Sequence, residues 1–155
     1  MIRDVLEGAE STNIRAGYIG EIGVSKNFTP QEEKVLRASA RAQAKTGVAL
    51  SIHLPVWERL AHKVLDIIAE EGGDISKTIL DHMNPSFEDV KYQTSLAERG
   101  AYLEYDMIGM DYYYANEQSQ SPSDEDNAKA IKNLIDLGFA NKLLLSQDVF
   151  LKMML

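Results

Sequence analysis

The chain has 155 residues and a formal net charge of -8, with 24 acidic and 16 basic side chains, and hydrophobic residues make up 45% of it. This length and composition suffice for one domain with a buried core, while the acidic balance and the lack of Lys/Arg clusters argue against nucleic-acid binding. The sequence contains no cysteine, which excludes disulfides and thiolate zinc sites.

The first segment, residues 1–15, predicts the end of a helix followed by a polar loop. Charged side chains such as Arg3, Asp4 and Glu7 interrupt it, so it lacks the apolar centre of a signal peptide. No apolar run in the sequence approaches the roughly 20 residues that a membrane-spanning helix needs. We therefore expect a protein without a membrane partner and with a cytoplasmic location.

Five short apolar runs follow along the chain and predict the strands of a parallel sheet. They are residues 17–23, 48–55, 78–84, 101–108 and 142–149. Short runs bounded by Gly or Pro are typical of strands buried on both faces. Successive runs are separated by about 30 residues, the spacing of consecutive βαβ units. The expected fold is therefore α/β, an open parallel sheet with two unpaired edges.

Four helices are predicted between these strands. Their predicted starts are Thr29, Pro55, Asn84 and Ser123, and glycines at positions 47, 72, 100 and 138 end them. The first start is the best marked, because Thr29, Pro30 and Glu32 form a capping box with proline at the first helical position. The last helix is predicted to turn four side chains inward: Ala128, Ile131, Leu134 and Ile135.

A long segment, residues 109–123, separates the fourth strand from the last helix. It is longer than a simple turn, and long loops at the carboxyl edge of such a sheet usually cover a functional site. Its tyrosine run, residues 112–114, predicts either the wall of a substrate pocket or an anchor for the loop.

Acidic and histidine side chains stand near the ends of all five predicted strands: Glu21, His53, His82, Asp106 and Asp148. The carboxyl ends of parallel strands meet at one edge of the sheet, where α/β enzymes place their chemistry. Imidazole and carboxylate are ligands that zinc and similar divalent metals prefer. We predict that Glu21, His53 and His82 form a metal cluster, with Asp148 as a further ligand and as the proton acceptor for an attacking water.

Other polar residues near these strand ends have simpler interpretations. A single histidine at a strand end is often only a hydrogen-bonded structural residue, although two neighbouring ones flanked by acids favour a metal site. Asp106 is predicted either to bind metal or substrate or to be a polar residue of the sheet rim. Asp81 is expected to point toward the helix layer, outside the site, and His62 is expected to face solvent.

Four segments, in this order, resemble the second half of the phosphotriesterase family within the amidohydrolase superfamily: GYIGEIG, SIHLP, LDHMN and LLLSQD. The resemblance implies part of a TIM (β/α)₈ barrel, namely strands four to eight, with about five parallel strands and four to five helices. Residues 1–155 would then form a single partial domain, apparently truncated at both ends.

The resemblance also implies a function. Members are metal-dependent hydrolases in which a metal-bound hydroxide attacks an organophosphate triester, a lactone or another ester, so a small molecule is the expected substrate. By the same resemblance, Glu21 would bridge two metals, and His53 and His82 would bind one of them. Asp148 would bind the other metal and move the proton of the bridging hydroxide.

The chain departs from the family pattern at one point. The first barrel strand of the family carries a His-x-His pair for the second metal, and the three histidines here, His53, His62 and His82, form no such pair. We therefore expect at most one zinc or other divalent transition metal on this chain, against two in a complete site. The unpaired edges predict a homo-oligomer or a complementing chain.

Two alternatives remain open. The chain could be an inactive half-barrel that acts only through binding or self-association. It could also be a nuclease similar to the TatD-like metal-dependent nucleases, which share the IGEIG motif at the equivalent strand. Against the nuclease alternative, VSKNF and SQD depart from the usual motifs of that family, and the net charge is acidic.

Overall fold

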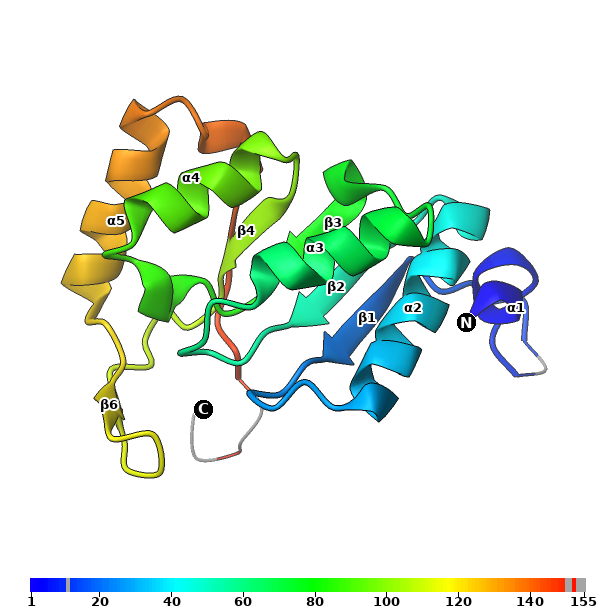
Figure 1. Cartoon of the computed structure of the whole chain (residues 1–155), viewed down its shortest axis with the longest axis horizontal. Coiled ribbons are helices and arrows are strands. Elements are labelled where there is room, and N and C mark those ends of the chain that lie inside the picture. Colours follow the sequence, from blue (N-terminus) through cyan, green and yellow to red (C-terminus); the bar gives the residue numbers. More distant parts are fainter. Residues whose placement is uncertain (11, 150–151, 153–155) are drawn as a thin grey trace.

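A computed structural model describes residues 1–10, 12–149 and 152, and its main element is one five-stranded parallel sheet (Figure 1). The spatial order of the strands follows the chain: β1 (Tyr18–Gly23), β2 (Ala49–His53), β3 (Thr78–Leu80), β4 (Tyr102–Tyr105) and β7 (Leu143–Leu145). All neighbouring pairs in this sheet are parallel. The predicted α/β fold and its five parallel strands are confirmed, and β1 and β7 form the two edges.

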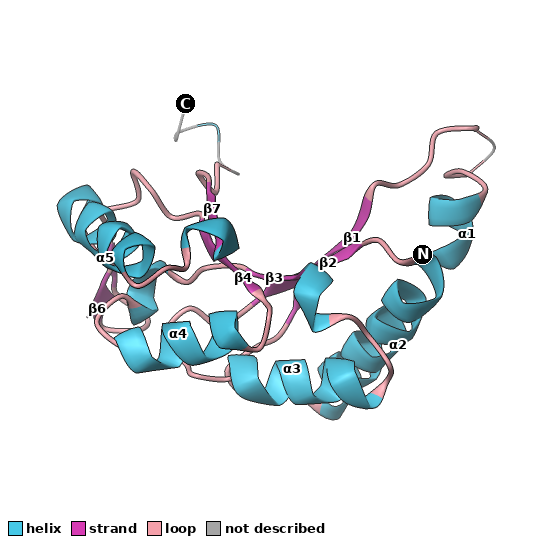
Figure 2. Cartoon of the chain, turned by 90° about the horizontal axis from the view of Figure 1, so that it is seen from above, coloured by secondary structure: helices cyan, strands magenta, loops and turns pink. Residues whose placement is uncertain are grey.

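Five α-helices accompany the sheet: α1 (Ile2–Leu6), α2 (Pro30–Thr46), α3 (Ala61–Glu70), α4 (Val90–Glu98) and α5 (Asp124–Asp136). Figure 2 shows the sheet as an arch with α2, α3, α4 and α5 along its outer face, while none of the described helices covers the concave face. The main core lies between sheet and helices and includes the fully buried side chains of Leu50, Ile52, Leu65, Leu80 and Leu103. The arch is the shape expected of half a barrel.

The predicted start and end of α2 are confirmed. The Thr29 hydroxyl accepts the N–H of Glu32 at 3.3 Å, and the Glu32 carboxylate accepts the N–H of Thr29 at 2.6 Å. At the other end, Gly47 adopts the left-handed conformation with φ 73°. These contacts satisfy backbone groups that the helix itself leaves without partners.

Two other predicted helix starts are wrong. Residues 54–60 form an irregular loop after β2, with a turn at 56–57, and α3 begins only at Ala61. Asn84 and Pro85 open a short 3₁₀ turn, and α4 begins at Val90. Asn84 cannot cap a helix because its side chain is used elsewhere: its Oδ1 accepts the N–H of Met107, and its Nδ2 donates to Asn127.

The start of α5 is confirmed, but its predicted inward face is partly wrong. The Ser123 hydroxyl accepts the N–H of Asp126 at 3.2 Å. Ala128 and Ile135 are exposed, whereas Asn127, Ala130 and Leu134 are buried. The Asn84–Asn127 hydrogen bond explains the difference, because it turns a polar residue of α5 toward the sheet.

The loop after β4 contains a small antiparallel hairpin, β5 (Tyr113–Tyr114) paired with β6 (Ser119–Gln120). The Tyr114 ring packs edge-on against Trp57 with ring centroids 5.4 Å apart, whereas Tyr113 is 62% exposed. The predicted strand over 142–149 shortens to three residues, and the methionines at positions 153 and 154 lie outside the described residues.

Candidate metal centre

Glu21 lies in an irregular part of β1. The register between β1 and β2 shifts between Ile19 and Ile22, so the chain gains one residue there, and such bulges redirect side chains. Next to it, a Cβ atom on Gly20 would lie 2.7 Å from the Cβ of Ser51. Only glycine fits so close to β2, and a glycine within a strand often marks such a close approach of a neighbouring backbone.

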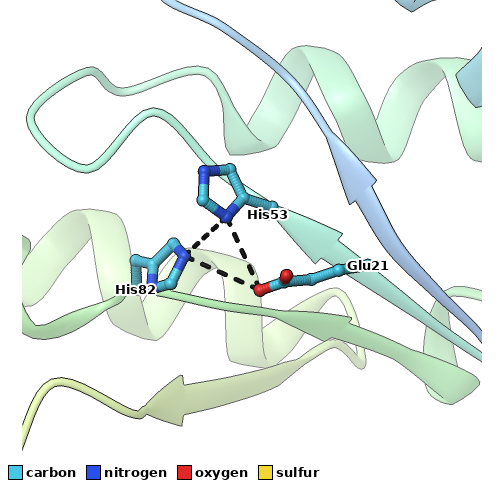
Figure 3. Close-up of side chains that lie close together, drawn as sticks. All are labelled: Glu21, His53 and His82. Atoms are coloured by element: carbon cyan, nitrogen blue, oxygen red, sulfur yellow. Dashed lines mark hydrogen bonds and ion pairs between the residues drawn. The ribbon is translucent and has the colours of Figure 1, made fainter. Parts of the chain in front are cut away.

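His53 is the last residue of β2 and stands at the carboxyl edge of the sheet, as predicted. Its Nδ1 lies 3.5 Å from Oε1 of Glu21. Figure 3 shows this nitrogen pointing toward Glu21 and His82 while the other ring nitrogen points away from both.

His82 reaches the same place from a strained backbone position. It follows β3 with φ 60°, which is uncommon for a residue other than glycine. Its backbone N–H lies 3.1 Å from both carboxylate oxygens of Asp106, and its Nδ1 lies 3.0 Å from Oδ1 of the same residue. A carboxylate can only accept hydrogen bonds, so Nδ1 carries the proton and Nε2 is left to face His53 and Glu21.

The three predicted ligands converge. Nε2 of His82 lies 2.8 Å from Nδ1 of His53 and 3.9 Å from Oε1 of Glu21 (Figure 3). One ligand atom from each residue lies within 4.8 Å of the other two. Two imidazole nitrogens and one carboxylate oxygen form a donor set suited to zinc and similar divalent metals. These residues therefore fit a metal ion. The carboxylate of Asp106 orients the His82 ring through the hydrogen bond to its Nδ1.

The electrostatics of the cluster favour a cation. Burial alone would lower the pKa of His82, but the hydrogen bond that its ring donates to Asp106 and the negative charges of Asp106, Asp81 and Asp148 outweigh this effect and raise the pKa. The same surroundings that stabilise an extra proton on His82 also attract a metal ion, and the two compete for the Nε2 lone pair.

Asp148 lies beside this cluster but outside its closest contacts. Its backbone N–H donates to the carbonyl of Asp106 at 2.6 Å, and a bridge between Met107 and Gln147 holds the same segment. Desolvation, together with repulsion from Asp106 and Glu21, raises the pKa of the Asp148 carboxyl. A carboxylate with a raised pKa accepts a proton more readily than an ordinary one, which suits the role predicted for it.

Asp81 lies on the opposite side from the one expected. It is only 2% exposed and lines a cavity of about 370 Å³ on the concave face, together with Glu21, Asp106 and Asp148. The Ser51 hydroxyl donates to its Oδ2 at 2.7 Å. Burial raises the pKa of Asp81 to about 7, with further contributions from Glu104 and Asp106.

The reason for this error is local. The prediction assigned opposite faces to neighbours in a regular strand, with His82 on the concave face. The left-handed backbone of His82 breaks that alternation, so both Asp81 and His82 serve the concave side. On the neighbouring strand β2, Ser51 is the register partner of Ile79. Side chains two residues apart in a strand point to the same face, so Asp81 lies on the same face as Ile79 and Ser51.

His62 is half-buried and does not face solvent as expected. Its Nε2 lies 2.9 Å from the Ser95 hydroxyl, and its Nδ1 lies 3.2 Å from the Arg99 guanidinium. Its ring also packs against Tyr92, with centroids 5.7 Å apart. His62 therefore joins α3 to α4 on the outer layer, away from the metal cluster.

The fold and the ligand cluster together define a class: a barrel-type α/β protein with metal-binding side chains at the carboxyl edge of its sheet. Residues 1–155 match the model of the Phosphotriesterase family, and the chain belongs to this family. This family consists of metal-dependent hydrolases. Among the described residues, none of the helices is both long and apolar enough to cross a membrane.

Curated relatives agree with this assignment. The chain is 40% identical to a phosphotriesterase-related protein of Nematostella vectensis over 151 residues, which cover 96% of this chain and 43% of the relative. It is 39% identical to an N-acetyltaurine hydrolase of Danio rerio over 154 residues, which cover 98% of this chain and 44% of the relative. The chain thus spans less than half the length of these relatives.

Solved structures show the same fold. A resiniferatoxin-binding protein from Rhodobacter sphaeroides superposes with a TM-score of 0.95 at 57% identity, covering 99% of this chain and 43% of that one. The phosphotriesterase homology protein from Escherichia coli, solved with phosphate in its active site, gives 0.86 at 29% identity, with coverages of 100% and 50%. A PTE-like lactonase mutant from Deinococcus radiodurans gives 0.81 at 28%, with coverages of 95% and 44%. These matches identify the arch as part of a TIM barrel.

Proposed function

We propose that this chain carries part of the active site of a metal-dependent hydrolase that cleaves a small ester, lactone or phosphotriester. The convergence of Glu21, His53 and His82 at the carboxyl edge of the sheet supports this proposal most directly. Membership of the phosphotriesterase family favours it over the TatD-like alternative. The activity belongs to the whole protein, of which this chain would supply one part.

Each residue has a defined role in this proposal. Glu21, His53 and His82 hold a divalent transition metal, with zinc as the first candidate. When bound, such a cation polarises the scissile bond and lowers the pKa of the attacking water. Asp106 keeps His82 in the tautomer that presents Nε2. Asp148 accepts the proton of the water and returns it to the leaving group.

One metal ion on this chain is the expected number. The sequence has no His-x-His pair, so a second ion would need ligands from other polypeptide segments in addition to Glu21 and Asp148. The substrate bond is a carbonyl or phosphoryl ester in the proposal. A relative named as a lactonase makes lactones the first substrates to assay, and relatives named as N-acetyltaurine hydrolases add N-acetyltaurine, an amide, as a test of whether the cleaved bond must be an ester.

The metal content of the purified chain tests the proposed ligands. After incubation with zinc and gel filtration, elemental mass spectrometry should find about one ion per wild-type chain, counting the single ligand cluster described above. His53→Ala and His82→Ala should each remove most of this zinc, because two remaining protein ligands hold zinc weakly. His62→Ala is the matched control and should retain it.

Two results would contradict the ligand assignment. Equal zinc loss in all three variants would point to misfolding, which far-ultraviolet circular dichroism of the same samples would reveal. Full zinc retention in His53→Ala and His82→Ala with intact folding would place the metal elsewhere. In a protein that also carries the remaining barrel strands, zinc binding without hydrolysis of any assayed substrate would favour the alternative of a half-barrel that only binds or self-associates.

A further inference from the structure

A buried polar network lies behind the turn that carries His82, on the face of the sheet that the helices cover. Its centre is Gln93 of α4, whose side chain is only 1% exposed. The other buried residues of α4, Leu96 and Ala97, are small or apolar, as expected for a helix that packs on a sheet. An amide in such a place needs hydrogen-bond partners within the core, because a buried polar group without a partner destabilises the fold.

Every polar atom of the Gln93 amide has a partner. Its Nε2 donates to the carbonyl of Met83 at 2.9 Å and to the hydroxyl of Ser86 at 2.8 Å. Its Oε1 accepts the hydroxyl of Tyr105 at 2.6 Å. A backbone carbonyl can only accept a hydrogen bond, so the Met83 carbonyl requires the NH₂ group of the amide. Burial raises the pKa of Tyr105 to about 12, and its hydroxyl therefore keeps the proton that it donates.

The Met83 carbonyl belongs to the peptide that directly follows the left-handed residue His82. On the sheet side, the N–H of Asp81 donates to a carbonyl of β2 and the N–H of Met83 to a carbonyl of β4, both at 3.0 Å. On the helix side, the Met83 carbonyl accepts from Gln93 and from the Ser86 hydroxyl. A left-handed backbone costs free energy in a residue other than glycine and persists only where its surroundings fix it. The contact with Gln93 is one of the contacts that fix it.

We infer that Gln93 is a positioning residue for the proposed metal ligand His82. It lies outside the ligand cluster and acts through the Met83 carbonyl, while Tyr105 satisfies the remaining oxygen of its amide. This role differs from that of Asp106, which binds the ring and the backbone N–H of His82. The inference rests on the proposed function, because it takes His82 to be a metal ligand.

Two single variants separate positioning from stability. Gln93→Leu keeps a similar volume but removes both donors, so the Met83 carbonyl loses its contact with α4. We expect zinc affinity, measured by competition with a chromophoric chelator, to fall about tenfold, the lower end of the effect of losing an outer hydrogen-bond partner of a metal site. Tyr105→Phe leaves the Gln93 donors in place. It should lower the midpoint of urea unfolding, because the Gln93 oxygen stays buried without its partner, but it should leave zinc affinity unchanged.

The double variant Gln93→Leu/Tyr105→Phe completes the comparison. In Gln93→Leu alone the Tyr105 hydroxyl is buried without its acceptor, whereas the double variant removes both partners, which costs less stability than removing one. We expect the double variant to regain part of the unfolding midpoint and to keep the weakened zinc binding of Gln93→Leu. Zinc affinity that returned together with stability would leave Gln93 with a structural role only and would overturn the inference.

Hydrogen exchange of the His82 amide gives a readout in the metal-free chain. This N–H is buried against the carboxylate of Asp106. Gln93→Leu and the double variant should exchange it several-fold faster than the wild type through local opening of the turn, relative to the core amides of β2. In Tyr105→Phe, any faster exchange at His82 should be matched by the β2 amides, because that variant changes global stability alone.

Two further results would overturn the inference. One is a Gln93→Leu chain that binds zinc as tightly as the wild type, and the other is an equal loss of affinity in Gln93→Leu and Tyr105→Phe. A wild-type chain that binds no zinc would instead contradict the ligand assignment of the proposed function. Faster His82 exchange confined to the two Gln93 variants would then still support the part of Gln93 in fixing the turn, and equal exchange in all variants would exclude it.

Discussion

At the level of single residues, Asp106 organises the candidate metal centre although it does not belong to the ligand triad. It contacts the ring and the backbone of His82 and thereby fixes both the tautomer and the strained φ of that residue. Its predicted roles were metal or substrate contact or a rim position. The structure shows it as a hydrogen-bond partner of His82, on the side away from Glu21 and His53.

We predict that Asp106→Asn lowers zinc affinity by about 10- to 100-fold, the usual effect of losing a carboxylate behind a histidine ligand. The amide can still accept a hydrogen bond but no longer supplies the negative charge. Competition with a chromophoric chelator measures the affinity. Asp111→Asn, a change in the exposed loop after β4, serves as the control. An unchanged affinity in Asp106→Asn would remove this orienting role.

At the level of secondary structure, the capping box of α2 makes stability depend on pH. The Glu32 pKa falls from 4.5 to about 2 because its carboxylate accepts the Thr29 N–H and the hydroxyls of Ser25 and Thr29. A lowered pKa in the folded state stabilises the fold above pH 4.5, and this contribution disappears as the pH falls to about 2.

Glu32→Gln should therefore lower the unfolding midpoint at pH 7 and should match the wild type near pH 2, the value to which the Glu32 pKa falls. Urea titrations at several pH values measure both. Glu125→Gln is the control: Glu125 also occupies the first turn of a helix, but among the described residues its side chain pairs only with Lys129. A constant difference between Glu32→Gln and wild type at all pH values would exclude the carboxylate as its cause.

The close approach of β1 to β2 gives a second test at this level. Gly20→Ala would place a methyl group 2.7 Å from the Cβ of Ser51. We expect a loss of about 1–3 kcal/mol in the free energy of unfolding, typical of overpacking, together with weaker zinc binding because Glu21 is adjacent. A methyl group on Gly23 meets no atom within 4 Å. Gly23→Ala should therefore be nearly neutral, and similar losses in both variants would contradict the steric explanation.

The sequence was sufficient for the features that depend on local chemistry. The capping box of α2, the five strands and the chemical types at their ends follow from short-range patterns. The start of α4 does not follow from such patterns, because the Asn84 side chain forms hydrogen bonds with Met107 and Asn127, which are distant in the sequence. The side of the sheet taken by Asp81 also depends on one left-handed residue that no periodicity reveals.

At the level of the whole molecule, the sheet resembles a barrel cut open along its axis. The concave face is bordered by β1 and β7, each paired on one side only within the described sheet. Apolar residues line part of that face, including Ile79, Tyr102 and Leu144. Unpaired strand edges beside apolar surface promote association with other chains.

We predict that the isolated chain self-associates, with a mass in light-scattering chromatography that rises above the monomer value as concentration increases. Leu145→Lys places a charge on edge strand β7, where Leu145 is 57% exposed, and should shift the equilibrium toward monomer. Leu137→Lys, at a 51% exposed position after α5, is the control and should not. A monomer at all concentrations would contradict this prediction.

The order of the three proposed ligands along the chain has a consequence for biosynthesis. Glu21 and His53 belong to β1 and β2, and His82 follows β3; these three strands are consecutive in the chain and adjacent in the sheet. A ribosome therefore releases the three ligands in the order in which their strands pair. Asp106, which orients His82, follows only with the next strand. An ion captured by the emerging polypeptide would thus meet a loosely held triad first and a rigid one only after β4 had been made.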